Sequence, residues 1–230
     1  MVTLLNISQY MQNMDQAYED IRENIVRAYT KVAASFSEVT DKRQATGDLD
    51  ELLGYWSGPP GSVVDLGCGT GKDVEYFQSK GWEATGVDLC PAMLEAAGAA
   101  YQDCNFLVGD MTEHDTGPVD IVYSNSAIDH LPADRRAMLL ARIAGSLSPG
   151  GLLYVKAREN KTDTVVTSEE YGDPITRFYG ALDEATFNAE LEAAGFEIIR
   201  SETYGPDYSG IPGKKVKNKF RVFARKVAPT

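Results

Sequence analysis

The sequence is poor in the residues that build metal sites and disulfide frameworks. It has three cysteines (Cys68, Cys90 and Cys104) and two histidines (His114 and His130) among 230 residues. The odd number of cysteines and the lack of CxxC spacing argue against a disulfide framework and against a zinc site. With two imidazoles, nitrogen ligands for a metal are scarce as well. We therefore expect no metal.

Long apolar runs are missing too. No stretch approaches the roughly 18 uninterrupted apolar residues of a membrane-spanning helix. The opening MVTLLNISQYMQNMDQ lacks the basic segment and apolar core of a secretory signal, so we expect a cytoplasmic protein without a membrane partner. The formal net charge of −12 also opposes nucleic-acid binding, because contacts between basic side chains and phosphates supply most of that affinity.

The pattern of the chain changes near residue 61. Before it, apolar residues recur at helical spacing over about residues 13–36, as one long helix or two short ones, and again over 48–55. After it, short β-prone runs alternate with helical stretches: SVVDLG, EATGVDL, NFLVGDM, VDIVYSN and LLYVKA. This alternation predicts an α/β fold whose parallel sheet has helices on both faces. After a long, polar and aromatic connection over residues 158–182, FEIIRSETYG and NKFRVFARKV predict a final antiparallel hairpin.

The glycines of VVDLGCGTG, at the end of the first β-prone run, indicate a ligand turn. Gly67 and Gly69 allow a tight turn and close approach of a ligand to the backbone. The spacing is not the GxxxxGK[ST] of a phosphate loop, and Lys72 stands where a dinucleotide fingerprint needs its third glycine. Asp65, just before the turn, disfavours a pyrophosphate and favours a ligand that carries an ammonium group.

Two further acids end the next β-prone runs. Asp88 follows Asp65 by 23 residues and stands where a carboxylate hydrogen-bonds ribose hydroxyls. Asp110 is placed to accept from an exocyclic amine, with Met111 beside it to cover a flat ring. Because ligands of open α/β sheets bind beyond the carboxyl ends of the strands, these acids predict a site for a nucleoside with an amino-acid-like tail.

With these features in order, the chain resembles the class I S-adenosylmethionine-dependent methyltransferases of small-molecule type. The motifs that carry the resemblance are VVDLGCGTG, GVDLCPAMLEAA, VGDM, DIVYSNSAIDHL and LSPGGLLYVKA, over roughly residues 61–158, and FRVFARK is similar to the family's last strand. The resemblance implies a Rossmann-like, seven-stranded, mostly parallel sheet with an antiparallel last strand. It also implies an N-terminal helical cap over residues 1–56, a core over 57–230 and a lid insertion at about 158–182.

The implied cofactor is S-adenosyl-L-methionine, with S-adenosyl-L-homocysteine as product. The resemblance places Asp65, Gly67 and Gly69 at the methionine half and Asp88 at the ribose. It further implies cofactor contacts from Tyr29, Cys68, Leu89, Met93, Asp110, Met111, Ser124 and Asn125. Tyr29 or Arg43, in the cap, is a candidate partner of the methionine carboxylate, against ordinary helix packing or surface charge. Cys68 is expected as small filler rather than as a reactive thiol.

The acceptor pocket must cover the exposed end of the cofactor site. Tyr171, Arg177 and Tyr179, in the lid insertion, are the candidate substrate contacts, and an aromatic lid suits a small organic acceptor. His130 is the one credible imidazole base or substrate contact, against a purely structural packing role.

The leading hypothesis is therefore an enzyme that methylates oxygen or nitrogen of a small molecule, as a monomer or homodimer. A protein or peptide N-methyltransferase and a non-catalytic adenosylmethionine-binding protein remain as alternatives. The first would show activity on intact proteins but not on small-molecule extracts. The second would bind the cofactor without consuming it.

Overall fold

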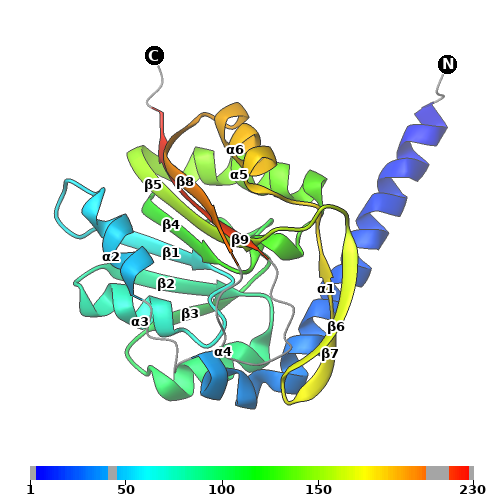
Figure 1. Ribbon diagram of the computed structural model, residues 1–230, viewed down its shortest axis with the longest axis horizontal. Coiled ribbons are helices and arrows are strands. Elements are labelled where there is room, and N and C mark those ends of the chain that lie inside the picture. Colours follow the sequence, from blue (N-terminus) through cyan, green and yellow to red (C-terminus); the bar gives the residue numbers. More distant parts are fainter. Residues whose placement is uncertain (1–3, 41–45, 206–217, 228–230) are drawn as a thin grey trace.

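The computed structural model describes residues 4–40, 46–205 and 218–227, and it is organised around one large sheet (Figure 1). Seven strands lie in the order β3-β2-β1-β4-β5-β9-β8. Their bounds are β1 Ser62–Leu66, β2 Glu83–Asp88, β3 Asn105–Val108, β4 Val119–Asn125, β5 Leu147–Arg158, β8 Phe196–Tyr204 and β9 Lys219–Lys226. The helices are α1 Leu4–Thr40, α2 Gly47–Gly54, α3 Lys72–Ser79, α4 Pro91–Ala100, α5 Ala133–Ser146 and α6 Glu184–Ala193, with a short 3₁₀ helix, η1, at Ile128–His130.

The pairing of the strands confirms the predicted fold class. β1 pairs in parallel with both β2 and β4, and the parallel series continues to β3 on one side and β5 on the other. β9 inserts antiparallel between β5 and β8, so the last strand of the chain is antiparallel to the core. The strand order reverses between β1 and β4, and a crevice beyond their carboxyl ends is where open α/β sheets bind ligands.

Side chains alternate across each strand, and both faces of the sheet are buried because helices pack on each of them. On one face, Val64 of β1 and Val122 of β4 join the cluster that includes Leu139 of α5 and Leu191 of α6. On the other face, a second cluster forms from the alternate positions of the same strands and from α2 and α3. Its members include Leu49, Leu52, Val63, Val74, Phe77, Ile121 and Tyr123. Neighbouring apolar residues in the short β-prone runs, such as Val63 and Val64, follow from this double burial.

The N-terminal region is one helix rather than two. α1 runs along one side of the sheet beside α4 and the hairpin of β6 (Thr164–Tyr171) and β7 (Asp173–Tyr179). Its first turns extend beyond the body of the molecule (Figure 1). α2 packs in the core against the sheet through Leu49 and Leu52 instead of joining α1. The boundary of the cap at residue 56 therefore stays a prediction. Within the described ranges, none of the helices combines the length and hydrophobicity needed to cross a bilayer.

The connection over residues 158–182 contains regular structure that the sequence did not predict. β6 (Thr164–Tyr171) and β7 (Asp173–Tyr179) form an antiparallel hairpin closed by Gly172, whose φ is +98°. Burial alternates along β7, with Ile175, Arg177 and Tyr179 buried. The apolar part of that face packs on α1, and the hairpin lies along this helix in Figure 1. The sequence predicts this stretch as a polar and aromatic connection and assigns no strands to it; the role of a lid stays a prediction.

Candidate functional site

A cavity of about 300 Å³ opens where the carboxyl ends of the central strands meet α1 and the β6–β7 hairpin. Its position is the switch point between β1 and β4. The predicted site residues that line it are Tyr29, Asp65, Gly67, Cys68, Gly69, Asp88, Leu89, Met93, Asp110, Met111, Asn125, His130, Tyr171, Arg177 and Tyr179. Segments separated by up to 150 residues thus converge on one space, and Ser124 is the predicted residue that does not reach it.

The glycine turn after β1 forms one wall. Gly67 has a φ of +79°, and a Cβ built there would lie 2.2 Å from the Cβ of Ala127. Its N–H donates to the carbonyl of Val87 at 2.8 Å, which ties the turn to β2. The turn therefore needs glycine for both its backbone conformation and its space. Burial raises the pKa of the neighbouring Cys68 thiol, so this side chain lines the cavity as a neutral thiol.

Asp65 is a buried acid without a hydrogen-bond donor. Its side chain lies at the end of β1 with 3% exposure, and no donor among the described residues contacts its carboxylate. Burial and then the charge of Asp73 raise the pKa of Asp65, while Lys72 opposes the shift. A buried carboxylate without a partner is costly. An ammonium group in the cavity would relieve that cost, which is the chemistry the sequence predicted for this position.

Asp88 supports the turn and still faces the cavity. Its two oxygens accept from the backbone N–H groups of Gly69 at 2.8 Å and Cys90 at 2.9 Å. Burial raises the pKa of Asp88, and these backbone donors act against the rise. Each carboxylate oxygen can accept two hydrogen bonds, so capacity remains for a hydroxyl group of a ligand.

Asp110 is engaged by α1, which the sequence did not predict. Tyr18 Oη lies 2.9 and 3.1 Å from its two oxygens, and Arg22 Nε lies 3.0 Å from Oδ2. Thr112 adds its backbone N–H at 2.7 Å and its hydroxyl at 2.8 Å. Oδ1 thus has both Thr112 donors, whereas Oδ2 has the Tyr18 hydroxyl and the charge of Arg22 beside it. The predicted contact with an exocyclic amine would use the remaining capacity of Oδ2. The i,i+4 spacing of Tyr18 and Arg22 predicts that both lie on one face of the helix. The sequence contains no signal that Asp110 is the residue they contact.

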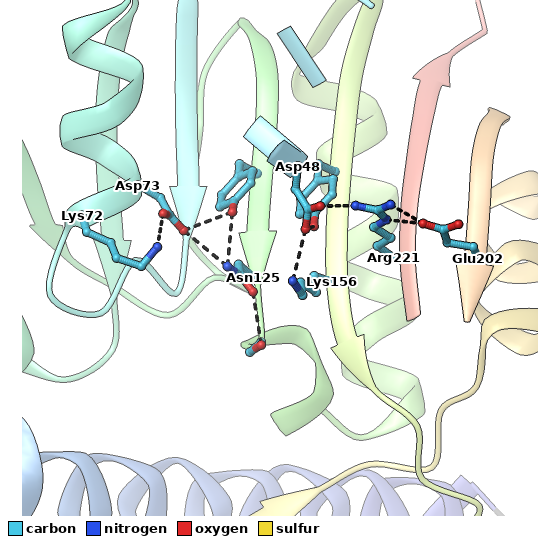
Figure 2. Close-up of polar contacts among 10 residues, drawn as sticks. Asp48, Lys72, Asp73, Asn125, Lys156, Glu202 and Arg221 are labelled. Atoms are coloured by element: carbon cyan, nitrogen blue, oxygen red, sulfur yellow. Dashed lines mark hydrogen bonds and ion pairs between the residues drawn. The ribbon is translucent and has the colours of Figure 1, made fainter. Parts of the chain in front are cut away.

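Ser124 and Asn125 are adjacent in β4 and therefore point to opposite sides. Ser124 is fully buried, and its hydroxyl donates to the carbonyl of Leu66 at 2.8 Å. Asn125 faces the cavity and donates through Nδ2 to Asp73 at 3.4 Å and to the Tyr123 hydroxyl at 3.3 Å (Figure 2). Of this predicted pair, only Asn125 is available to a ligand.

A second polar group continues along the strand ends beyond Asn125. Asp48, from α2, accepts from Lys156 of β5 at 3.1 Å and pairs with Arg221 of β9, which in turn pairs with Glu202 (Figure 2). Asp48 and Lys156 line the cavity. Sequence reasoning missed this network because its members come from α2, β5, β8 and β9 and no motif joins them.

His130 is fixed by hydrogen bonds at both ring nitrogens. Nδ1 lies 2.7 Å from the Phe178 carbonyl, which can only accept, so Nδ1 carries the hydrogen. Nε2 then accepts from the hydroxyl of Tyr29 at 3.0 Å, and Arg177 donates to the same hydroxyl at 3.2 Å. Burial lowers the pKa of His130. The neutral imidazole has its lone pair occupied, so the predicted role as a base requires Tyr29 to move.

Aromatic rings line the end of the cavity that lies against the hairpin. Phe36 and Tyr171 have centroids 4.7 Å apart, and His130 and Tyr179 4.6 Å apart. Tyr29 links the two pairs, at 5.9 Å from both Phe36 and His130. We call this row of rings the aromatic wall. Arg43, the alternative to Tyr29 in the cap, lies outside the described residues.

Comparisons with known proteins agree with this geometry. Residues 63–151 match the family model of a methyltransferase domain. Trans-aconitate 2-methyltransferase of Deinococcus radiodurans is 39% identical over 129 residues, which cover 54% of this chain and 48% of that protein. The enzyme of the same name from Methylobacterium nodulans is 34% identical over 131 residues, covering 56% and 50%. The chain thus spans about half the length of the curated relatives it matches.

Solved structures share the fold over most of the chain. Burkholderia thailandensis 1,6-didemethyltoxoflavin-N1-methyltransferase, with bound 1,6-didemethyltoxoflavin and S-adenosylhomocysteine, has a TM-score of 0.68 at 24% identity, covering 93% of this chain and 90% of that one. The glycopeptide N-methyltransferase MtfA, complexed with S-adenosyl-L-homocysteine, has a TM-score of 0.61 at 20% identity, covering 79% and 89%. Residues 63–151 thus match a methyltransferase domain, and the strand order and the motifs of this chain resemble those of the class I, S-adenosylmethionine-dependent methyltransferases.

Proposed function

We propose that the protein transfers the methyl group of S-adenosyl-L-methionine to an oxygen or nitrogen atom of a small-molecule acceptor. The observation that carries this proposal is the single cavity that joins the strand-end acids, Asp65 and Asp88, to the aromatic wall. One end suits a nucleoside with an ammonium group, and the other suits an organic molecule.

The residues of the strand ends fit the cofactor. Asp65, a buried carboxylate that no described donor contacts, would accept from the methionine ammonium group. Asp88, already fixed by Gly69 and Cys90, would accept from the ribose hydroxyls without reorganising. When bound, the cofactor supplies a sulfonium methyl group, which passes to a nucleophile in line with the breaking carbon–sulfur bond while the sulfur leaves as a neutral thioether.

The aromatic wall has the second task of positioning the acceptor and excluding water. In-line displacement requires the nucleophile close to the methyl carbon and aligned with it, so orientation supplies much of the rate. Rings held by mutual contacts and by the Tyr29–His130 hydrogen bond lose little freedom when an acceptor binds. An acceptor that must lose a proton would use the neutral His130, after Tyr29 has moved away from Nε2.

A small acceptor is favoured over a protein because α1 and the β6–β7 hairpin enclose this end of the cavity. The names of the relatives add support, since trans-aconitate and 1,6-didemethyltoxoflavin are small molecules. The cytoplasmic location and the division into cap, core and lid remain parts of the proposal.

Calorimetry with S-adenosyl-L-methionine tests the cofactor assignment directly. We expect the parent to bind and Asp88→Ala to lose about 1–3 kcal/mol of binding free energy, since a charged hydrogen-bond acceptor is removed. Asp88→Asn, which keeps the size and one acceptor, should lose less. Asp103→Ala, at an exposed acid outside the cavity, is the matched control and should bind as the parent does. Absence of binding by the parent would refute the cofactor assignment.

Consumption of the cofactor then separates the three functional hypotheses. We expect turnover with small-molecule extracts. Turnover confined to intact proteins would favour a protein methyltransferase, and binding without turnover in either would favour a non-catalytic protein.

A further inference from the structure

Arg158 presents a guanidinium group that no described residue pairs with. It ends β5 and lines the cavity, and its guanidinium carbon lies 4.5 Å from the centroid of the Tyr179 ring. Its backbone N–H donates to Asp129 at 3.3 Å. In the described part of the chain, neither a hydrogen bond nor an ion pair reaches the guanidinium itself.

The other arginines of the cavity are occupied. Arg177 is buried, donates to Tyr29 and to the Ser168 hydroxyl at 2.9 Å, and lies 3.7 Å from Glu170. Arg22, at the opposite end, is paired with Asp110. Arg158 therefore differs from both, because its charge is balanced by no acid within ion-pair distance among the described residues.

Two acids near Arg158, namely Asp129 and Glu170, do not form an ion pair with its guanidinium. Asp129 accepts from the backbone N–H of Arg158 through one oxygen, and its other oxygen is buried without a hydrogen-bond partner among the described residues, so it does not bond the guanidinium. Glu170 lies beside Arg177. The guanidinium lies over the ring of Tyr179, and its N–H donors have no hydrogen-bond partner among the described residues, which leaves them for a ligand. That fork matches the two oxygens of a carboxylate.

We propose that the acceptor carries a carboxylate group and that Arg158 binds it, at the end of the cavity formed by the aromatic wall. This inference rests on the proposed function and narrows its acceptor to organic acids. The planar donors of Arg158 bind the carboxylate edge-on, and the neighbouring rings of Tyr179 and Tyr171 contact the apolar part of the molecule. Arg158 is thereby a specificity-determining residue that sequence reasoning did not select.

Benzoate and benzamide are the probes, because they share one planar shape and differ in charge. Each is titrated into protein saturated with S-adenosyl-L-homocysteine and followed by calorimetry. The variants are Arg158→Gln, which removes the charge, and Arg158→Lys, which keeps it without the planar fork. Arg142→Gln removes one positive charge from an exposed position of α5 outside the cavity and serves as the matched control.

We expect benzoate to bind the parent and Arg142→Gln alike, and to bind Arg158→Gln roughly tenfold or more weakly, as for loss of a charge-assisted hydrogen bond. The benzoate affinity of Arg158→Lys should lie between those of the parent and Arg158→Gln. Benzamide should not bind the parent. The affinity for S-adenosyl-L-homocysteine and the melting temperature of Arg158→Gln should match the parent, whereas a purely structural role would lower both.

Equal binding of benzoate and benzamide, undiminished benzoate binding by Arg158→Gln, or no benzoate binding by the loaded parent would each overturn the proposal. The protein is first titrated with S-adenosyl-L-homocysteine alone. If the parent fails to bind it, that result refutes the proposed function rather than the role of Arg158.

Discussion

Substitution of Tyr18 or Arg22 tests whether α1 is fastened over the cofactor end of the cavity. Both side chains reach from α1 to the buried carboxylate of Asp110. Tyr18→Phe removes one hydroxyl and keeps the ring. Arg22→Gln removes the charge, and Arg27→Gln on an exposed face of the same helix is its matched control.

The two contacts differ in strength. The Tyr18 hydroxyl donates to a charged, buried acceptor, and such a hydrogen bond contributes about 1.5–3 kcal/mol. Asp110 keeps its two donors from Thr112, so the lower end, about 1.5 kcal/mol, is expected for Tyr18→Phe. Arg22 is a weaker partner, because its side chain is 25% exposed and its Nε lacks hydrogen-bond geometry. About 1 kcal/mol is expected for Arg22→Gln, and less than 0.5 kcal/mol for Arg27→Gln.

Urea unfolding measures these losses, and stopped-flow release of S-adenosyl-L-homocysteine measures their consequence. If the cofactor leaves when α1 lifts, a loss of about 1.4 kcal/mol in the fastening speeds release about tenfold. Tyr18→Phe should therefore release the ligand about tenfold faster than the parent, and Arg27→Gln at the parent rate. Reduced stability with an unchanged release rate would refute the reasoning, because α1 would then not govern exit from the cavity.

Two further perturbations follow from the site. Burial lowers the pKa of His130, so the unfolded chain binds more protons than the native state just below the ordinary value of 6.5; unfolding free energy should fall as pH drops through this region. His130→Gln should flatten that fall in urea titrations, and an unchanged slope would contradict it. Gly67→Ala places a methyl group 2.2 Å from the Cβ of Ala127 at a positive φ and should cost about 2 kcal/mol in thermal unfolding. Gly98→Ala, in α4 with open space around its Cβ position, should be neutral or stabilising; equal losses for both would exclude the steric account.

The parts of the site that could be predicted from the sequence are those encoded locally. Asp65, the glycine turn and Asp88 lie at the ends of short apolar runs, and parallel strands bring their carboxyl ends to one edge. Ser124 shows the limit of such reasoning. A motif names neighbouring residues together, but alternation along β4 sends Ser124 into the core and Asn125 into the cavity.

The parts that could not be predicted depend on contacts between distant segments. Tyr18 and Asp110 are 92 residues apart, and Asp48 and Arg221 are 173 apart. The hairpin of β6 and β7 was missed for a related reason. Arg177 occupies a buried position of β7 that an apolar residue would ordinarily mark. It donates there to Tyr29 and Ser168, and Glu170 lies within ion-pair distance of its charge, while its Nε has no hydrogen-bond partner among the described residues.

Acidic side chains gather at one end of the cavity and Arg158 lies at the other end. This difference in charge favours one placement of the cofactor and the acceptor. At the strand ends, Asp65, Asp73 and Asp88 gather with Lys72 as the nearby cation. Their mutual repulsion and burial make the unliganded site costly, and a cationic ligand group relieves both. At the hairpin end, Arg158 has no acid paired with it among the described side chains. A ligand pair bearing an ammonium group at one end and a carboxylate at the other matches this polarity in one orientation only.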